Sequence, residues 1–553
     1  MKRTLSFLFL FVCLPVIAQE STDTEPTRIT GPLTAEGYID YFKALEEKML
    51  PPELATDDNG FRIFVRAFGD VDTLFFTQEI YRLQRYEKLG LDPNGSPTMT
   101  LPPDPREVIR DFREAQGETV PNWRGINIGE RPWTLDEYPM LAEWIKEIDK
   151  PMDAIAEMIR KPVFAPPLYQ GAKSLETGTP QNLQALLLPD VSGFREIARI
   201  FQVRATYRIS QGNIDGAIDD KLTLHRFGRL VAPKSCLLQF LVGIAIESMA
   251  SAIPIHANPE HPLTEQQIRR ILEGLDALPP RVPISEVFEW ERIAMLSVVQ
   301  IIQITSDKGE RVTDTDIAPI LALVRNASRN APFDWDIVYR RINEIWDAVH
   351  EPLPRAKYRS MREESLMPSG RQVALAFLNP DALGTVVGNL LIGLFFPAFE
   401  FAEEAGRRAE CADNMQRLAL AIMLYQLEHG KMPDANWAVQ IEKYLGDGAP
   451  GDGAERYFSC PSNPTAKGET VYALIQYGDT VPDSRDMLLL VELLEPVPLD
   501  KAVITVEEVL ARNRTGGSHP AGMNVAHRNG AVRFLSHSVS EVELRQLLGG
   551  ERI

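Results

Sequence analysis

Histidine and cysteine are scarce in this chain of 553 residues, which contains eight histidines and four cysteines. No pair of cysteines has the Cys-x-x-Cys or Cys/His spacing of a zinc site. The chain also lacks a Gly-x-Ser-x-Gly elbow, a glycine-rich phosphate loop and a His-Glu-x-x-His motif. We therefore assign no catalytic, cofactor-binding or metal-ligating residues from the sequence, and we expect no cofactor.

Positive charge is also in short supply. Lys and Arg number 58 against 77 Asp and Glu, which gives a formal net charge of −19. A negative field repels a phosphate backbone, so nucleic acid is not among the expected partners. Hydrophobic residues make up 44% of the chain and charged residues 24%, which is ordinary for globular proteins and excludes global disorder. The length allows roughly two to four domains.

The N-terminus has the pattern of a secretory signal peptide over residues 1–18. Two basic residues precede an apolar run from Leu5 to Ala18, which ends in small side chains before Gln19. This pattern predicts cleavage between Ala18 and Gln19 and an exported protein of the periplasm, the cell envelope or the cell surface. The alternative is an uncleaved signal segment that anchors the chain in a membrane.

Residues 19–378 predict a large all-α domain of stacked helical hairpins. The clearest hairpin is 197–230, where two helical stretches flank the tight turn Gly212-Asn213. The small residues of this unit resemble those of a tetratricopeptide hairpin. Residues 96–132 contain many prolines and glycines and predict a long surface connection. Further helices are predicted over residues 34–50, 235–253, 264–278, 284–305 and 334–349.

Three groups of polar residues in this domain have more than one interpretation. Glu286, Glu289 and Trp290 lie one helical turn apart and would suit acid–base chemistry in a cleft, but an acidic first turn of a helix explains them as well. Three aspartates lack EF-hand spacing and four histidines lack metal spacing, so both sets are expected to be surface or core residues. They are Asp307, Asp314 and Asp316, and His225, His256, His261 and His350.

An uncharged run over residues 382–399 opens the C-terminal part of the chain. Its length is at the lower margin for crossing a bilayer. Its glycines and Pro397 favour burial against the α-domain, and membrane association through this run is the alternative. The helical pattern continues up to Gly430, so we expect one long helix over about 382–429.

Several motifs follow one another after this run. Cys411 lies on the long helix, and Cys460 opens a Cys-Pro-Ser turn. Nine residues separate His519 from Asn529-Gly530. In this order the motifs resemble those of bacterial type IV pilin-like and type II secretion pseudopilin-like proteins, in particular the family with a C-terminal His-x9-Asp-Gly motif. The resemblance covers about residues 388–553, with Asn-Gly in place of Asp-Gly.

The resemblance implies a pseudopilin-like α+β module over residues 379–553, in which the long helix packs on a small antiparallel β-sheet. The overall fold class is therefore α+β. Asn529-Gly530 by itself predicts a type I′ turn in a β-hairpin over residues 523–535, because both residues tolerate a positive φ. We interpret His519, Asn529 and Gly530 as structural residues.

The cysteines left after signal cleavage allow at most one disulfide within the chain. Cys236 lies in an apolar stretch that predicts a buried helix, so it is expected to be an inert core thiol. Cys411 and Cys460 are then the predicted disulfide pair.

A metal site is an alternative interpretation of the C-terminal histidines. His519, His527 and His537 could join Glu492, the last residue of a predicted buried strand, around an ion. Strand alternation and hydrogen bonding within turns explain these residues without a metal, and this simpler interpretation is preferred.

One departure from the pilin pattern bears on function. In pilin-like proteins the apolar helix begins at a processed N-terminus and packs into a filament, whereas here residues 19–378 precede it. The leading interpretation is a non-enzymatic protein of the cell envelope with a structural or protein-interaction role and protein partners. The alternatives are an extracytoplasmic hydrolase with a carboxylate or metal site in the α-domain, and an accessory pseudopilin of a type II secretion-like apparatus.

Overall fold

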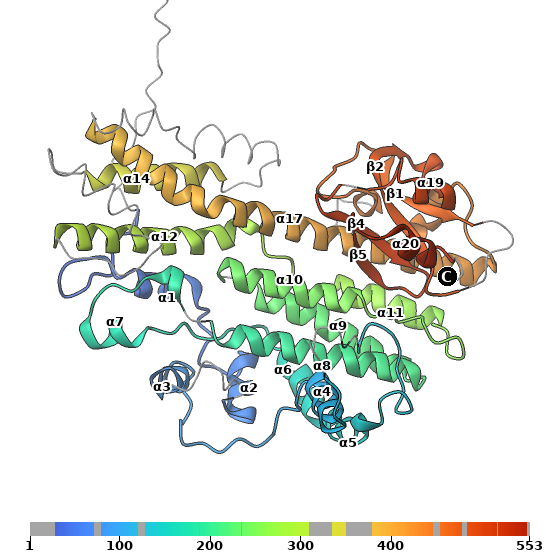
Figure 1. The fold of residues 1–553 in the computed structure, drawn as a ribbon, viewed down its shortest axis with the longest axis horizontal. Coiled ribbons are helices and arrows are strands. Elements are labelled where there is room, and N and C mark those ends of the chain that lie inside the picture. The colour runs from blue at the N-terminus through green and yellow to red at the C-terminus, as the bar shows by residue number, and fades with distance from the viewer. Residues whose placement is uncertain are drawn as a thin grey trace, which may run out of the picture.

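The computed structural model of the chain has an elongated helical body with a small β-sheet at one end (Figure 1). This is the expected α+β class with a large helical part. The predicted cleavage site between Ala18 and Gln19 lies outside the described residues, as do Asp314, Asp316 and His350. The structure describes residues 28–70, 79–119, 126, 128–186, 188–233, 235–308, 334–349, 379–445, 454–477, 484–516 and 518–549.

Helices make up most of the body. They are α1 (Tyr41–Met49), α2 (Gly60–Phe68), α3 (Glu79–Lys88), α4 (Pro105–Ala115), α5 (Ala142–Glu147), α6 (Asp149–Ile159), α7 (Ala172–Thr177), α8 (Asp190–Ser210), α9 (Ile214–Val231), α10 (Leu237–Ser251), α11 (Glu265–Asp276), α12 (Ile284–Asp307) and α14 (Trp335–Val349). The predicted hairpin is confirmed as α8 and α9. Gly212 turns the chain with a φ of 74°, and the Asn213 side chain caps α9 by accepting the Gly216 N–H.

Two predictions for the body are wrong. The helix expected over residues 34–50 begins only at α1, because the Asp40 side chain caps its first turn by accepting the Lys43 N–H. The segment 96–132 is not a connection throughout, since it contains α4. Asp104 caps this helix, and Pro105 takes its first position. An N–H at that position would have no partner within the helix, so proline loses no hydrogen bond there.

Two glycines allow α9 and α10 to pack in close contact. A Cβ atom on Gly228 would lie 2.6 Å from the carbonyl oxygen of Gly243, and one on Gly243 would lie 2.7 Å from the carbonyl oxygen of Gly228. Both distances are too short for any side chain, and the atoms met belong to the backbone. The two helices can therefore approach this closely only with glycine at both positions.

The long helix is confirmed as α17 (Pro380–His429), which runs from the far end of the body to the sheet (Figure 1). Its segments 382–393 and 396–429 meet at an angle of 41°. Pro397 accounts for the bend, because proline has no N–H to donate to the carbonyl group four residues earlier. Within the described chain no single helix is long and apolar enough to cross a membrane, and this bent pair meets the criteria only as a pair.

The first part of α17, up to Phe399 just after the bend, is buried against α12 and α14. The Phe399 ring lies 5.1 Å from that of Phe288 on α12 and 4.8 Å from that of Trp346 on α14, between ring centroids. Gly384 and Gly388 allow this contact, since a Cβ atom on either would lie 2.8 to 3.1 Å from a side chain of α14. The glycines of the uncharged run therefore serve close helix packing.

The sheet consists of β1 (Glu469–Gln476), β2 (Leu488–Pro498), β3 (Val503–Thr505), β4 (Gly522–His527) and β5 (Val532–Ser536) in the order β3-β1-β2-β4-β5. Three short helices accompany it: α18 (Trp437–Ile441), α19 (Val506–Ala511) and α20 (Glu541–Leu547). The prediction of a purely antiparallel sheet is wrong at one edge, where β3 is parallel to β1. The end of β2 lies beside the start of β1. From there the chain crosses to the other edge of β1 and pairs with the end of that strand, so β3 runs in the same direction as β1.

The predicted β-hairpin is confirmed as β4 and β5, but its turn is not of type I′. Gly530 has a φ of 80°, whereas Asn529 is not among the residues with positive φ. The Gly530 N–H bonds to the His527 carbonyl, and the Asn529 side chain accepts the Ala531 N–H. The loop 528–530 thus has three residues with a left-handed glycine last, because the asparagine side chain stabilises the turn without a left-handed backbone.

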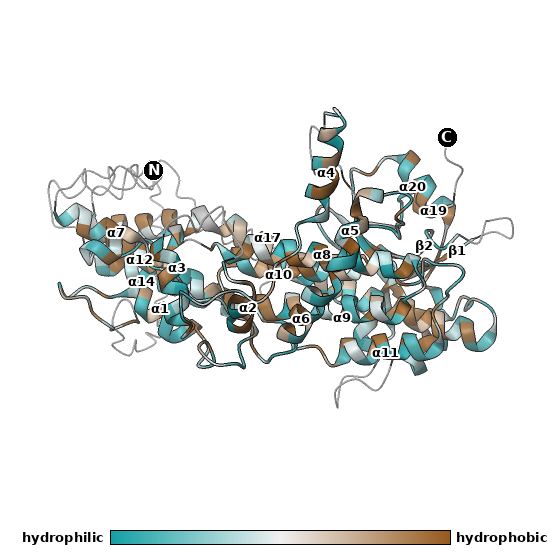
Figure 2. Ribbon diagram, turned by 90° about the horizontal axis from the view of Figure 1, so that it is seen from below, coloured by the Kyte–Doolittle hydropathy of each residue, from teal (hydrophilic) through white to brown (hydrophobic). Residues whose placement is uncertain are grey.

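One hydrophobic core crosses from the body into the sheet. Buried apolar side chains of α2, α8 and α9 continue through the second segment of α17 to β1, β2 and α18. Figure 2 shows α10 and α17 together in the middle of the molecule, with apolar stretches along them. The C-terminal part of the chain, with α17 and the sheet, and the body therefore share buried surface.

The contact between α9 and α10 leads to a stability prediction. We expect Gly228→Ala to lower the free energy of unfolding by about 1–3 kcal/mol, because the added methyl group meets backbone atoms that must move apart. Gly193→Ala on α8 is the matched control, since its Cβ atom meets no heavy atom within 4 Å. This control should raise stability by about 0.5–1 kcal/mol. Urea unfolding of both variants provides the measurement, and equal effects would contradict the close contact.

Candidate functional site

Four side chains capable of binding a metal or acting as nucleophiles converge where α17 meets the sheet. Cys411 lies on α17, Cys460 in the turn before β1, Glu492 within β2 and His519 in the loop before β4. One ligand atom of each lies within 4.8 Å of those of the other three. All four residues are only 0 to 1% exposed, so the site lies in the interior. We call it the Cys-Glu-His cluster.

Hydrogen bonds and short contacts connect the members of this cluster. The Cys460 Sγ atom lies 3.6 Å from His519 Nε2, and the same Nε2 lies 3.2 Å from Glu492 Oε1. The Cys411 thiol donates a hydrogen bond to Glu492 Oε1. Imidazole Nε2 and carboxylate Oε1 thus face the two sulfur atoms.

Three neighbours fix the orientation of the cluster. His519 Nδ1 lies 2.5 Å from Glu404 Oε1 on α17. Glu492 Oε2 accepts the backbone N–H of Asn524 at 2.8 Å. The sulfur atom of the α17 cysteine accepts a hydrogen bond from Tyr472 Oη at 3.2 Å. The bonds to His519 Nδ1 and Glu492 Oε2 leave His519 Nε2 and Glu492 Oε1 facing the centre of the cluster.

The cluster shifts the pKa values of its members in opposite directions. The neighbouring Cys411 thiol outweighs burial and, with the contact to His519, lowers the pKa of Cys460 to about 6. Burial disfavours a charged imidazole, but hydrogen bonds to Cys460, Glu404 and Glu492 raise the pKa of His519 to about 11. Burial raises the pKa of Cys411 well above its ordinary value. In the absence of a metal, the cluster therefore favours a thiolate beside an imidazolium.

A thiolate of this kind is a nucleophile only where a substrate can reach it. Cys460 and His519 have no appreciable exposure, so the geometry does not suit nucleophilic catalysis. Two other uses remain for paired thiols in such a site: a disulfide and the binding of a metal ion.

The structure places the predicted cysteine residues as follows. Cys411 and Cys460 lie in one cluster, as a disulfide would require, and are present as free thiols. The disulfide stays a prediction. Cys236 is confirmed as a buried residue at the start of α10, and burial raises its pKa to about 12, as suits an inert thiol.

Only one of the three C-terminal histidines joins Glu492. His519 does so, whereas His527 Nδ1 bonds to the backbone oxygen of Asp486, and His537 follows β5 outside the cluster. The cysteines take the positions that these histidines would have filled. Sequence spacing could not predict the Cys-Glu-His cluster, because its four residues come from separate elements. No motif in the sequence singled out Glu404, which contacts His519.

Of the two acidic residues singled out on α12, Glu289 forms ion pairs with basic side chains. Glu289 contacts Arg292 at 2.5 Å and Lys48 on α1. Burial favours a higher pKa for Glu289, but the hydrogen bonds from Arg292 and Lys48 outweigh it and lower that pKa. Glu286 lies in the first turn of α12 and Trp290 is buried. This arrangement supports a structural role for the carboxylates.

A second buried polar group joins α9, α10 and α17. Asp413 Oδ2 accepts hydrogen bonds at 2.7 Å from both Arg229 and Arg281, and Glu247 lies 2.5 to 2.8 Å from the same arginines. His225 lies beside them, and burial lowers its pKa to about 3. Because two guanidinium groups already neutralise the two carboxylates, we interpret this group as structural.

The remaining candidates of the body are structural or exposed. His256 Nδ1 accepts the Leu263 N–H at 3.0 Å, and the His261 ring lies beside Gly212 in the α8–α9 turn. Asp307 is the last residue of α12. None of them lies in the Cys-Glu-His cluster.

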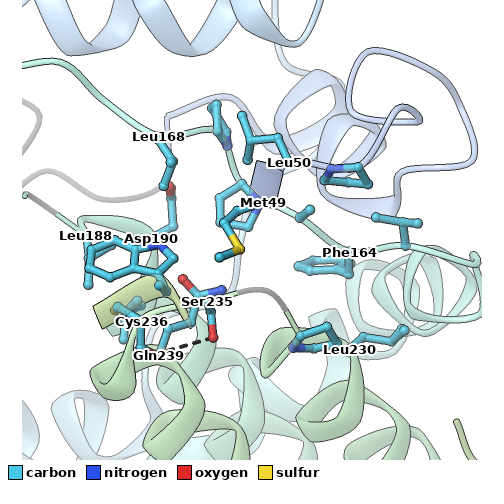
Figure 3. Close-up of a pocket in the computed structure, with 18 of the residues that line it drawn as sticks. Met49, Leu50, Phe164, Leu168, Leu188, Asp190, Leu230, Ser235, Cys236 and Gln239 are labelled. Atoms are coloured by element: carbon cyan, nitrogen blue, oxygen red, sulfur yellow. Dashed lines mark hydrogen bonds between the residues drawn. The ribbon is translucent and has the colours of Figure 1, made fainter. Parts of the chain in front are cut away.

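An apolar cavity of ≈ 390 Å³ lies between the end of α1, residues 162–169 and the start of α10 (Figure 3). Met49, Phe164 and Leu230 contribute to its lining. Its lining includes two carboxylates, Glu53 and Asp190, and Arg85 at 2.5 Å and Tyr169 at 2.9 Å already bind that of Asp190. The cavity is thus suited in shape and polarity to a small apolar molecule.

The fold and this site define an α+β protein in which a long helix and a sheet enclose a cluster of two cysteines, a glutamate and a histidine. No family model, no curated protein and no solved structure matches the chain. The pseudopilin-like family of residues 388–553 therefore remains a prediction that depends on the motifs quoted above.

Lys221 leads to a prediction of pH dependence. Its ammonium group is fully buried on α9 and donates to the Ala250 carbonyl at 2.6 Å. Burial outweighs the attraction of Asp413 and lowers the pKa of Lys221 to about 7. An unfolded lysine has a pKa of about 10.4, so between these values the unfolded chain binds a proton that the folded chain does not. Lys221 therefore adds about 1.4 kcal/mol per pH unit to the slope of the free energy of unfolding there, and His519, whose pKa is raised on folding, contributes a slope of opposite sign.

We expect Lys221→Met to lower this slope by about 1.4 kcal/mol per pH unit relative to the unmodified chain, measured by urea unfolding at about pH 8 and about pH 9. Lys467→Met is the control, because the Lys467 side chain is 85% exposed and its removal should leave the slope unchanged. An unchanged slope in Lys221→Met would show that the buried lysine keeps its proton on folding.

Proposed function

We propose that this chain is a non-enzymatic, exported protein of the cell envelope, in which a pseudopilin-like module is fixed to a helical body that binds protein partners. One observation carries the proposal: α17, which takes the place of the filament helix of pilin-like proteins, buries most of its apolar side chains inside this chain, and only Phe401 and Leu427 are exposed among its large described apolar side chains. The helix contacts α12, α14, α10, α11 and β4. Gly384 and Gly388, before the bend, lie against α14, and Phe399, just after it, lies against Phe288 of α12.

A second set of contacts fixes the module to the body. The Asn529 carbonyl accepts the His256 N–H at 2.8 Å, at the end of α10. Arg485 donates to the backbone oxygens of His256 and Asn258 at 3.0 and 2.7 Å. Gly530 lies at this contact, since an added Cβ atom would lie 3.2 Å from Ile255. The hairpin turn of the His-x9-Asn-Gly motif therefore faces the body, where it joins the two parts.

These contacts favour a role in envelope assembly over the role of a filament subunit. A subunit of a filament offers its apolar helix to other subunits, whereas here helices of the same chain cover that surface. The ion-paired carboxylates on α12 also give the hydrolase alternative no support. The negative charge of the chain favours partners with basic surfaces, through long-range attraction.

The proposal predicts a processed chain outside the cytoplasm. In the bacterium that makes it, the protein should begin at Gln19, fractionate with the envelope or the exported proteins, and form a complex larger than one chain on native electrophoresis. Ala18→Arg is the control, because a large charged side chain at the cleavage site should block processing and leave the longer precursor.

Three results would contradict the proposal. An unprocessed chain in the cytoplasm would overturn export. Recovery of the chain in filaments sheared from the cell surface would favour the accessory pseudopilin. A chain that remains monomeric in every envelope fraction would exclude the assembly role.

A further inference from the structure

We propose that the Cys-Glu-His cluster binds one zinc ion in a closed, four-coordinate structural site. The ligands are the sulfur atoms of Cys411 and Cys460, Oε1 of Glu492 and Nε2 of His519. This proposal depends on the geometry of the cluster and not on the envelope role of the protein.

The distances within the cluster suit a tetrahedral ion. Zinc bonds of about 2.3 Å to sulfur and about 2.0–2.1 Å to nitrogen or oxygen place neighbouring ligand atoms about 3.2–3.8 Å apart. Cys460 Sγ and Glu492 Oε1 lie 3.6 and 3.2 Å from His519 Nε2. Cys411 must move away from Glu492, because its thiol proton now bonds to that carboxylate and would be lost on metal binding.

The neighbours of the cluster orient its ligand atoms in the way that zinc sites require. Glu404 binds Nδ1 of His519 and so leaves Nε2 as the atom that faces the centre. This is the carboxylate–histidine–metal arrangement found around ligating histidines. Asn524 likewise binds the outer oxygen of Glu492, and Tyr472 donates to Cys411. Each of these bonds is compatible with a metal at the centre.

The ligand types select the ion. Two thiolates with an imidazole favour zinc over magnesium and calcium, which prefer oxygen ligands. The burial of all four residues leaves no open position for water or substrate, so the site is structural rather than catalytic. Its ligands come from α17, the turn before β1, β2 and the loop before β4. One ion would therefore connect the long helix to the sheet.

The nearby group of His225, Glu247 and Asp413 is a weaker candidate for the same role. Its carboxylates already bind Arg229 and Arg281, whose positive charges would repel a cation. In the Cys-Glu-His cluster, no arginine or lysine hydrogen bond to a ligand atom is present among the described residues.

The test starts from the full chain, purified through a tag without histidine and with neither metal nor chelator added. Elemental analysis should find one zinc per chain. After exchange of zinc for Co²⁺, the visible spectrum should show the intense bands of tetrahedral cobalt bound to thiolate. Alkylation followed by peptide mapping should modify Cys411 and Cys460 only after chelator treatment, whereas modification of Cys236 should not depend on the chelator.

Variants separate the ligands from their surroundings. Cys460→Ser should lose the cobalt–thiolate bands or weaken them strongly, and Cys236→Ser is the matched control that should keep both zinc and spectrum. Glu404→Gln tests the outer contact, and we expect it to weaken zinc affinity by about 10- to 100-fold in competition with a chelator.

Two outcomes would overturn the proposal. An intact mass lighter by two hydrogen atoms, with a Cys411–Cys460 peptide and no zinc, would show a disulfide in place of the metal. Reduced cysteines that bind neither zinc nor Co²⁺ when these are supplied would show a thiolate–imidazolium pair alone. Both outcomes are measured on the unmodified sequence, so they remain decisive if a variant fails to fold.

Discussion

The burial of one helix is the constraint on which the rest of this structure depends. α17 has 50 residues, and buried apolar side chains recur along it from Leu383 to Tyr425. A helix with this pattern is stable only if protein covers it for most of its length. The body covers the first segment, and the body and sheet together cover the second. The two parts of the chain share a core for this reason, and the bend at Pro397 lets one helix follow both surfaces.

Polar groups that lie along this buried helix need partners, because an unpaired charge in the interior costs several kcal/mol. Asp413 has two arginines, and Glu404 has His519. Glu492 is completely buried, and it has the backbone N–H of Asn524, the Cys411 thiol and the imidazole. A zinc ion in the Cys-Glu-His cluster would add a positive charge beside Glu404 and Glu492, both of which contact His519.

The parts of the fold that could be predicted from the sequence are those that local patterns determine. The helices α8 to α12 follow from apolar periodicity with glycine and proline at their ends, and α17 follows from a helical pattern that continues through Pro397 up to Gly430. The parallel strand β3 and the turn at Asn529 could not be predicted, because a crossing over β1 and a side-chain bond decide them. The same holds for the site. Cys411 and Cys460 were singled out as a disulfide pair, and His519 as a structural residue or, in the metal alternative, a partner of Glu492. The sequence did not join these two pairs, because only the packing of α17 on the sheet brings them together.

Hydrogen–deuterium exchange along α17 tests the central claim most directly, that both parts of the chain bury this helix as one unit. The account predicts that the amides of residues 383–392 and of residues 411–425 are both strongly protected in solution and lose protection together as denaturant is added. Rapid exchange of residues 383–392 in the absence of denaturant, with residues 411–425 still protected, would contradict it and would show that the rest of this chain does not cover the first segment of α17 in solution.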